Sequence, residues 1–251
     1  MELTNKSRKE TVIMASLKKY IRSHVLRTLK HNLRTANSYL NQDIDFSKSC
    51  DNYQLFSHAC SNTDKPLSPY EYFKSRLSEV YVHNRKDVKV LAEWVITLPQ
   101  EIDGKDDEIK FFKTCVDFLS ERYGYQNRID ATVHVDEVVN DIGQPHLHFT
   151  FIPCTSDDNP KHKECDKVCA SEILSKFEYR TFHTDLQGAI DAAKIKANVV
   201  SGITKSNGGN KSVRELKLET RIMSLERELE REREYNRELE RNMTLIYEQS
   251  Y

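Results

Sequence analysis

The sequence lacks long hydrophobic runs: no apolar stretch approaches the roughly 18 residues that a membrane-spanning helix needs. It opens with a polar, charged segment instead of the apolar core of a secretory signal peptide. Its six cysteines show no CxxC spacing, so we interpret them as reduced thiols and expect no disulfide framework. These absences favour a cytoplasmic protein with no membrane span.

An excess of charge is also absent, because the formal net charge is −1. Overall charge therefore gives no reason to expect a nucleic-acid partner. The distribution differs: residues 1–42 hold nine Lys/Arg and two Asp/Glu. Such a basic block fits binding to a polyanion, and a solvated basic face explains it equally well. The length of 251 residues, 31% of them charged, suggests one substantial domain plus a part outside any core.

Hydrophobic periodicity predicts a mixed α/β chain. We expect strands at residues 11–16, 88–98, 128–137 and 145–152, and helices at 17–40, 71–81, 108–123 and 171–199, the last broken near Gly188. Residues 41–69 and 154–168 show no hydrophobic period and are expected to be loops. Turn residues at 140–143 predict that strands 128–137 and 145–152 form an antiparallel hairpin.

A different pattern begins at Val213. Positions in a 4-3-4-3 spacing, typical of a coiled coil, are Leu218, Ile222, Leu225, Leu229, Glu232, Asn236, Leu239, Met243 and Ile246. Asn236 at an a position favours a parallel dimer in register, and a single charge-laced helix is the alternative. We therefore expect a domain over residues 1–200, a glycine-rich linker over 201–212 and a homodimeric coiled-coil helix over 213–251.

Three histidines lie on the predicted hairpin. Because side chains alternate along a strand, His146 and His148 share one face, and His134 and Asp136 share a face of the partner strand. Three neutral imidazoles with open coordination positions suit a divalent metal such as Mn, Zn, Fe, Co or Ni. Asp136 is placed to orient a ligand imidazole by accepting a hydrogen bond from the ring nitrogen that does not bind the metal. The sequence thus predicts a three-histidine metal site, with ordinary surface or core histidines as the alternative.

The metal alone leaves the reaction open, since hydrolysis, oxygen chemistry and phosphoryl transfer all use such sites. The zinc-deaminase pattern is absent, because no PCxxC follows the histidines. Cys165 and Cys169 with His162 form a weaker candidate for a second metal site.

Four segments together resemble a known family. His134-Val-Asp-Glu137 followed by Pro145-His-Leu-His148 resembles the HxDExxPHxH motif of MobV-type relaxases, the Mob/Pre plasmid mobilisation and recombination family of HUH endonucleases. His31-Asn-Leu-Arg34 resembles its HNxR motif, and residues 41–55 and 85–97 resemble two further segments in the same order. The chain has seven residues, 138–144, where the family usually has two. We expect this longer turn to leave the site intact.

The resemblance implies an α/β (α+β) domain with a central antiparallel β-sheet flanked by helices. It implies a relaxase that nicks and rejoins single-stranded DNA at a plasmid or mobile-element transfer origin through a covalent 5′-phosphoryl-protein intermediate. A divalent metal ion, Mn²⁺ or Mg²⁺, would be bound by His134, His146 and His148. The implied partners are single-stranded or supercoiled origin DNA and the conjugation coupling machinery.

The resemblance also assigns catalytic roles. His31 would be the nucleophile, and the carboxylate of Glu137 would hold its tautomer; Tyr39 and Tyr53 are the alternative nucleophiles. Strict alternation places Glu137 opposite His134, so we expect the strand to end or bulge before it.

Three cations, Arg34, Arg85 and Lys86, are candidates for contacts with DNA phosphates. Trp94 is expected in the core rather than as a base-stacking platform, and residues 205–211 as a linker rather than a phosphate contact. Two other functions stay open: an origin-binding accessory protein of the same ancestry that does not cleave, and a three-histidine metalloenzyme with a closed apolar pocket for small molecules.

Overall fold

The computed structural model describes residues 15–39, 41, 43–60, 63–139, 142–143, 145–200 and 213–248. The chain divides into two compact units with the boundary between residues 201 and 202. The first residues of the predicted strand 11–16 and the whole predicted linker 201–212 lie outside the described residues.

The first unit is built on a five-stranded antiparallel sheet of order β1-β5-β9-β6-β2. Its strands are β1 (Ala15–Ile21), β5 (Lys89–Thr97), β9 (His146–Phe151), β6 (Arg128–His134) and β2 (Tyr53–Gln54). Strands β5, β9 and β6 are almost wholly buried, as expected for central strands covered on both faces. The predicted central antiparallel sheet and the hairpin of strands 128–137 and 145–152 are confirmed.

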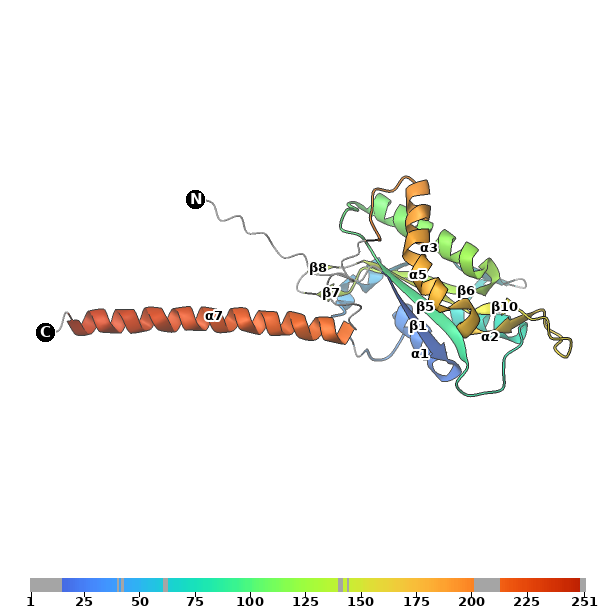
Figure 1. Ribbon diagram of the computed structural model, residues 1–251, viewed down its shortest axis with the longest axis horizontal. Helices are drawn as coiled ribbons and strands as arrows, with labels where there is room; N and C mark the ends of the chain where they lie inside the picture. Colours follow the sequence, from blue (N-terminus) through green and yellow to red (C-terminus); the bar gives the residue numbers. More distant parts are fainter. Residues whose placement is uncertain are drawn as a thin grey trace. The chain divides into compact units, whose positions relative to one another are not determined.

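Helices cover both faces of this sheet (Figure 1). Helices α3 (Lys105–Tyr123) and α5 (Lys176–Ala192) pack on one face, and α1 (Arg22–Asn32) and α2 (Pro69–Ser78) on the other. Trp94 is buried as predicted: its ring stacks on Phe182 of α5 at 3.5 Å, and its Nε1 donates to the hydroxyl of Tyr123 at 2.8 Å. The main core therefore lies between the sheet and α3 and α5.

The predicted helix start at residue 17 is wrong, because β1 continues to Ile21 and α1 begins at Arg22. β1 pairs with β5 from Ala15 opposite Ile96 to Ile21 opposite Lys89. It lies at the edge of the sheet, where charged side chains, lysine above all, are well tolerated. The basic residues that suggested a helix are thus part of an edge strand.

Several short elements were not predicted, because segments of two to six residues are too short to show a hydrophobic period. In residues 41–69 the structure forms η1 (Phe46–Asp51), β2, β3 (His58–Cys60) and β4 (Thr63–Leu67). In residues 154–168 it forms β10 (Cys154–Ser156) and β11 (Asp166–Val168). The predicted helix 171–199 consists of α4 (Ala170–Ile173) and α5, and Gly188 lies inside α5 without breaking it.

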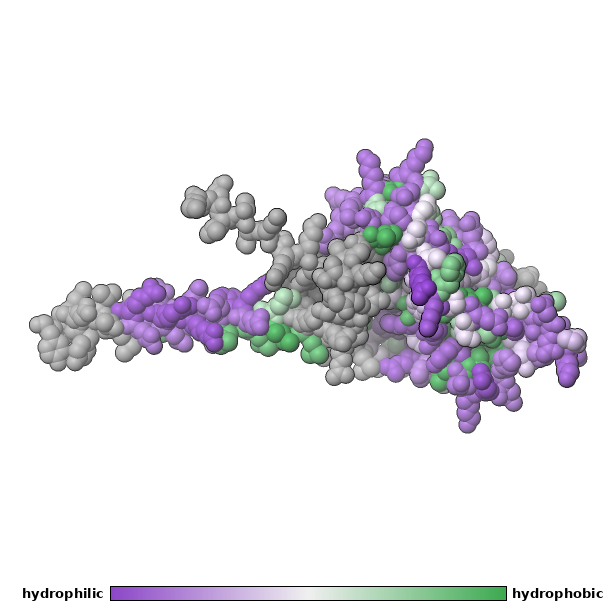
Figure 2. Space-filling view, viewed as in Figure 1, coloured by the Kyte–Doolittle hydropathy of each residue, from purple (hydrophilic) through white to green (hydrophobic). Residues whose placement is uncertain are grey.

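The second unit is one helix, α7 (Val213–Glu248). Its described seam residues Leu218, Ile222, Leu225, Leu229 and Leu239 are 42–54% exposed in the single chain. Figure 2 shows hydrophobic residues along one side of the first half of α7, with hydrophilic residues over the rest. Among the described residues, no helix is both long enough and apolar enough to cross a bilayer.

We expect Phe182→Ala to destabilise the first unit by about 3–5 kcal/mol, because it leaves a cavity beneath Trp94. Urea denaturation of the full chain would measure this free energy. Phe177→Ala on the same helix is the matched control: Phe177 is 72% exposed, so its loss should cost less than about 0.5 kcal/mol. Equal destabilisation by both substitutions would contradict this account of the core.

Candidate metal centre

The pairing of β6 with β9 brings the three predicted histidines together. His134 lies opposite His146, and His148 lies opposite Thr132, so all three imidazoles project from one face of the sheet. They are 0%, 9% and 6% exposed for His134, His146 and His148. One ligand nitrogen from each lies within 4.8 Å of the other two. The histidines converge as strand alternation predicts, and the seven-residue turn does not shift their register.

Hydrogen bonds fix which nitrogen two of these rings present. His134 Nε2 lies 2.7 Å from the backbone oxygen of Asn32. His148 Nδ1 lies 2.9 Å from Oε1 of Glu93. Because both partners only accept, these nitrogens carry the ring protons. The lone pairs are therefore on His134 Nδ1 and His148 Nε2, in the arrangement that metal-binding imidazoles commonly show.

The ring of His148 offers a direct test of whether the site fits a metal ion. Its Nε2 is buried and has no hydrogen-bond partner among the described residues. A buried lone pair without a partner is costly, and coordination of a cation would satisfy it. Burial, and then the nearby His148 and Arg34 side chains, hold the pKa of His134 far below its usual range, so its ring is neutral as a ligand must be. The three histidines therefore fit a divalent metal.

Glu93 of β5 supports the centre and was missed from the sequence. Its carboxylate is 2% exposed and accepts from His148 Nδ1, from Asn32 Nδ2 at 2.9 Å and from the hydroxyl of Tyr20. Burial alone would raise the pKa of Glu93, but the adjacent His148 ring and the hydrogen bonds from His148 and Tyr20 lower it to about 2. A single carboxylate within the apolar strand 88–98 was the available signal.

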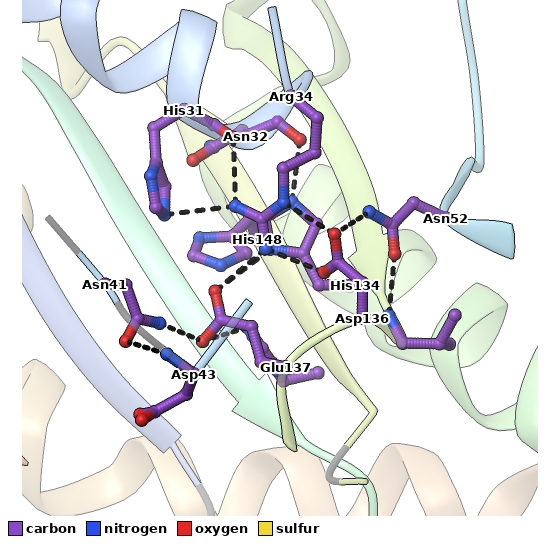
Figure 3. Close-up of polar contacts among 12 residues, drawn as sticks. His31, Asn32, Arg34, Asn41, Asp43, Asn52, His134, Asp136, Glu137 and His148 are labelled. Atoms are coloured by element: carbon purple, nitrogen blue, oxygen red, sulfur yellow. Dashed lines mark hydrogen bonds and ion pairs between the residues drawn. The ribbon is translucent and has the colours of Figure 1, made fainter. Parts of the chain in front are cut away.

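Glu137 reaches the histidines because β6 ends at His134, which removes the conflict with strict alternation. Its Oε1 is 3.8 Å from His134 Nδ1, and its Oε2 is 3.9 Å from His146 Nε2. Asn41 donates to Oε2 at 2.9 Å (Figure 3). Burial would raise the pKa of Glu137, but the nearby His146 ring and the hydrogen bond and charge of Arg34 lower it, so the carboxylate is ionised.

Arg34 connects the two halves of the site. Its Nη2 donates to Asp136 Oδ1 at 2.7 Å, to Glu137 Oε1 at 2.9 Å and to His134 Nδ1 at 3.1 Å. The guanidinium is only 7% exposed, and the residue has a φ of 53°, a conformation that non-glycine residues rarely adopt. Arg34 is thus held by carboxylates in this structure, and its contact with a DNA phosphate stays a prediction.

Asp136 is fully buried behind Arg34. Besides Arg34, it accepts from Ser49 Oγ at 2.6 Å and from Asn52 Nδ2 at 2.8 Å. Among the described hydrogen bonds, none joins Asp136 directly to an imidazole. Asp136 is connected to His134 through Arg34. The backbone oxygen of Asn32 and the carboxylate of Glu93 make the direct contacts that we expected of Asp136.

His31, near the end of α1, faces the cluster (Figure 3). Its ring centroid lies 6.0 Å from that of His134 and 6.1 Å from that of His148. Its Nε2 lies 3.4 Å from Arg34 Nη1, and because a guanidinium only donates, Nε2 carries the lone pair. Burial, with the nearby His148 ring and the charge of Arg34, lowers the pKa of His31 and keeps the ring neutral.

The two alternative nucleophiles differ in position. The ring of Tyr39 lies 5.8 Å from that of His31, so it is next to the centre. The hydroxyl of Tyr53 donates to Glu108 at the start of α3 at 2.8 Å, and burial raises its pKa. Tyr53 is therefore engaged elsewhere.

The remaining candidates lie apart from the histidines. Arg85 and Lys86 are exposed and precede β5, whose first residue is eight positions from Thr97, the partner of His146. That strand length puts the start of β5, which Arg85 and Lys86 precede, roughly 25 Å along the sheet from the centre. His162 pairs with Asp157 and stacks on Tyr81. Among the described residues, no second cluster of metal ligands forms, so the site of His162 with Cys165 and Cys169 is not supported.

Comparison with known proteins identifies the family. The family model of plasmid recombination enzymes, Mob_Pre, matches residues 9–218. The chain belongs to the Mob_Pre family. A plasmid recombination enzyme of Bacillus thuringiensis is 32% identical over 163 residues, which are 63% of this chain and 34% of that protein. One of Streptococcus agalactiae is 27% identical over 223 residues, or 86% of this chain and 41% of that protein. The chain thus spans well under half the length of these Mob_Pre relatives.

A solved Mob_Pre structure shares the fold. The relaxase domain of MobM, crystallised with manganese and the oriT DNA of plasmid pMV158, is 25% identical with a TM-score of 0.62. The match covers 81% of this chain and 96% of that domain. The five-stranded sheet with helices on both faces is therefore the fold of a MobV relaxase domain, as the HxDE and PHxH motifs predicted.

We expect Glu93→Gln to weaken Mn²⁺ binding by about 10- to 100-fold, because it removes the negative charge that raises the basicity of the His148 ring. Isothermal titration calorimetry on the full chain measures this affinity. Glu178→Gln is the control: Glu178 is also a buried carboxylate, but it lies on α5, on the other face of the sheet, and accepts from Arg122 and Tyr123. An equal loss in both variants would contradict a specific role for Glu93.

Proposed function

We propose that this chain is a metal-dependent DNA relaxase that nicks and rejoins single-stranded DNA at a plasmid or mobile-element transfer origin. The observation that carries the proposal is the position of the neutral His31 ring beside the cluster of three buried histidines. Its centroid lies 6.0 Å from that of His134 and 6.1 Å from that of His148, whose Nε2 has an unsatisfied lone pair. Membership of the Mob_Pre family and the likeness to a relaxase domain crystallised with manganese and oriT DNA support it.

His134, His146 and His148 would hold the divalent metal, Mn²⁺ or Mg²⁺, through their lone pairs. At His134 Nδ1 the metal would replace the contact with Arg34 Nη2. The bound ion supplies Lewis-acid polarisation of the scissile phosphate and fixes its orientation. Asn32 and Glu93 keep the rings of His134 and His148 in the tautomers that present these lone pairs.

His31 is the nucleophile. Its Nε2 lone pair attacks phosphorus, an N–P bond forms, and the bond from phosphorus to the 3′ oxygen breaks. The electron pair leaves with that oxygen, which takes a proton from solvent and becomes the free 3′-hydroxyl. In the reverse step a 3′-hydroxyl attacks the phosphoramidate and releases its proton to solvent, the N–P bond breaks, and the imidazole regains its lone pair. The intermediate keeps the 5′ end attached to the protein between the two steps.

Glu137 acts on His31 through Arg34. The carboxylates of Glu137 and Asp136 hold the guanidinium, whose Nη1 faces His31 Nε2 at 3.4 Å. This donor fixes the tautomer with the lone pair on Nε2, which is the role expected of Glu137. Arg85 and Lys86 are exposed cations that contact DNA phosphates away from the centre, and the conjugation coupling machinery is the expected partner after nicking.

The surroundings of the centre favour a phosphodiester over a small apolar substrate. Arg34, Glu137 and Asn41 line the histidine cluster with charged and polar groups. A small-molecule metalloenzyme would instead present a closed apolar pocket. The other alternative, an accessory protein that binds the origin without cleaving it, is tested together with the nucleophile.

We expect the full chain with Mn²⁺ to form a covalent adduct with labelled single-stranded DNA from the transfer origin of the element that encodes it. His31→Ala should abolish the adduct, because the attacking nitrogen is removed, whereas Tyr39→Phe and Tyr53→Phe should retain it. Denaturing gel electrophoresis detects the adduct and the freed strand. Chelation of the metal should prevent both.

If the wild-type chain forms no adduct with any of several divalent metals, the proposed relaxase activity is excluded. Origin binding without an adduct would then support the accessory protein. If His31→Ala still forms the adduct and a tyrosine variant does not, the assignment of His31 as the nucleophile is wrong.

We also propose that α7 pairs with α7 of a second copy as a parallel coiled coil, because its leucine seam is exposed in the single chain. Sedimentation equilibrium of the full chain should give a dimer, and Leu225→Glu at a d position should give a monomer. Met223→Glu is the control, since Met223 is at the outer b position of the same heptad and should leave the dimer intact. A wild-type monomer at high concentration would refute the pairing.

A further inference from the structure

We propose that five side chains at the end of β6 distant from the histidines form a binding platform for single-stranded DNA. The members of this stacking platform are Phe56, His58, Tyr72, Tyr125 and Arg128. The proposal rests on the proposed function, because it names a second place where the same DNA ligand is held.

The platform is a continuous row of rings and one cation. The Arg128 guanidinium lies over the ring of Phe56 at 4.3 Å and over that of Tyr125 at 5.2 Å. Phe56 meets His58 edge-on at 5.3 Å, and His58 stacks on Tyr72 at 3.5 Å with ring planes 7° apart. Three segments distant in sequence therefore contribute to one row of aromatic surface.

Arg128 differs from the other well-packed arginines of the domain. Arg34, Arg76 and Arg122 each donate to carboxylates at 2.9 Å or less. Arg128 is half-buried against two rings, and no carboxylate or carbonyl among the described residues accepts from its guanidinium. A cation fixed by two rings, with its N–H groups uncommitted, is suited to a phosphate or a base edge.

The platform is continuous with the candidate metal centre along the sheet edge. Tyr53 pairs with Val133 and Gln54 with Thr132, next to His134. The chain then follows β6 outward: Leu55 N donates to Ala131 O at 2.9 Å, and His58 Nε2 lies 3.0 Å from Ile129 O. Arg128 is six residues from His134 on β6, or roughly 20 Å at the rise of a strand. The register shift between Arg128 and Asp130 places Arg128 opposite Phe151, on the face covered by α3 and α5. A strand bound at the histidines would therefore reach the platform around the β2 edge of the sheet.

The chemistry favours an unpaired strand. Aromatic rings interleaved with arginine hold nucleotides by stacking on the faces of bases, and these faces are accessible when the strand is unpaired. The part of the row that is most open, Tyr125, is 49% exposed and next to the uncommitted cation. Stacking of this kind tolerates any base, so the platform would anchor the strand while the centre acts on it.

The test uses fluorescence anisotropy of the full chain with a labelled single-stranded oligonucleotide of mixed sequence, without divalent metal, and with the duplex of that sequence. Tyr125→Ala should weaken single-strand binding by about 5- to 100-fold, the range for loss of one stacked base. Arg128→Gln should weaken it and lower the salt dependence of log K by about 0.7, one phosphate contact on a single strand. Tyr179→Ala is the matched control, since Tyr179 is 45% exposed on α5 and contacts Lys19 at 5.8 Å.

Unchanged affinity in both Tyr125→Ala and Arg128→Gln would overturn the platform, and so would an equal loss for the duplex or in the Tyr179→Ala control. Absence of single-strand binding by the wild-type chain would also overturn it. Because no metal is present, the result is independent of cleavage. If the wild-type chain binds through the platform but forms no adduct with Mn²⁺, only the proposed relaxase activity is refuted. If it forms the adduct and both platform variants bind single-stranded DNA as tightly as the wild type, only the platform is refuted.

Discussion

The register between β6 and β9 is the constraint on which the centre depends. With His134 opposite His146, every second residue of both strands faces α1, and the residues between them face α3 and α5. A slip of one residue between these strands would place His134 on the face of Leu147 instead of the face of His146 and His148, and the three imidazoles would no longer converge. The same apolar packing that stabilises the sheet therefore also specifies the ligand geometry, because Val133, Leu147 and Phe149 are fully buried only in this register.

The face that carries the histidines holds several charges away from water. A buried carboxylate such as Glu93 costs several kcal/mol unless hydrogen bonds replace its hydration. Here three donors surround it, and Asn32 links it to the carbonyl that holds His134. On the other side of the cluster, Arg34 donates hydrogen bonds to the carboxylates of Asp136 and Glu137. The two networks meet at His134, so the orientation of that ring depends on both.

The sequence was sufficient for the features with strong periodicity or chemical spacing. The hairpin, the buried Trp94 and the convergence of His134, His146 and His148 follow from alternation along strands. The residues that hydrogen-bond to the histidine rings could not be predicted in this way, because their identity depends on how α1 and β5 pack together. Glu93 and Asn32 were missed for that reason. Residues 17–21 were misassigned because sheet pairing overrides the local preference of a basic segment at an edge.

The turn between the two halves of the motif forms its own short ladder, β7 (Val138–Val139) with β8 (Ile142–Gly143), beyond the end of β6. Extra residues at the tip of a hairpin change neither which side chains oppose each other nor which face they take, whereas one extra residue inside a strand would invert the face. The number of residues between HxDE and PHxH is thus free to vary. A pattern search that fixes this spacing would discard chains such as this one, in which the opposed histidines are intact.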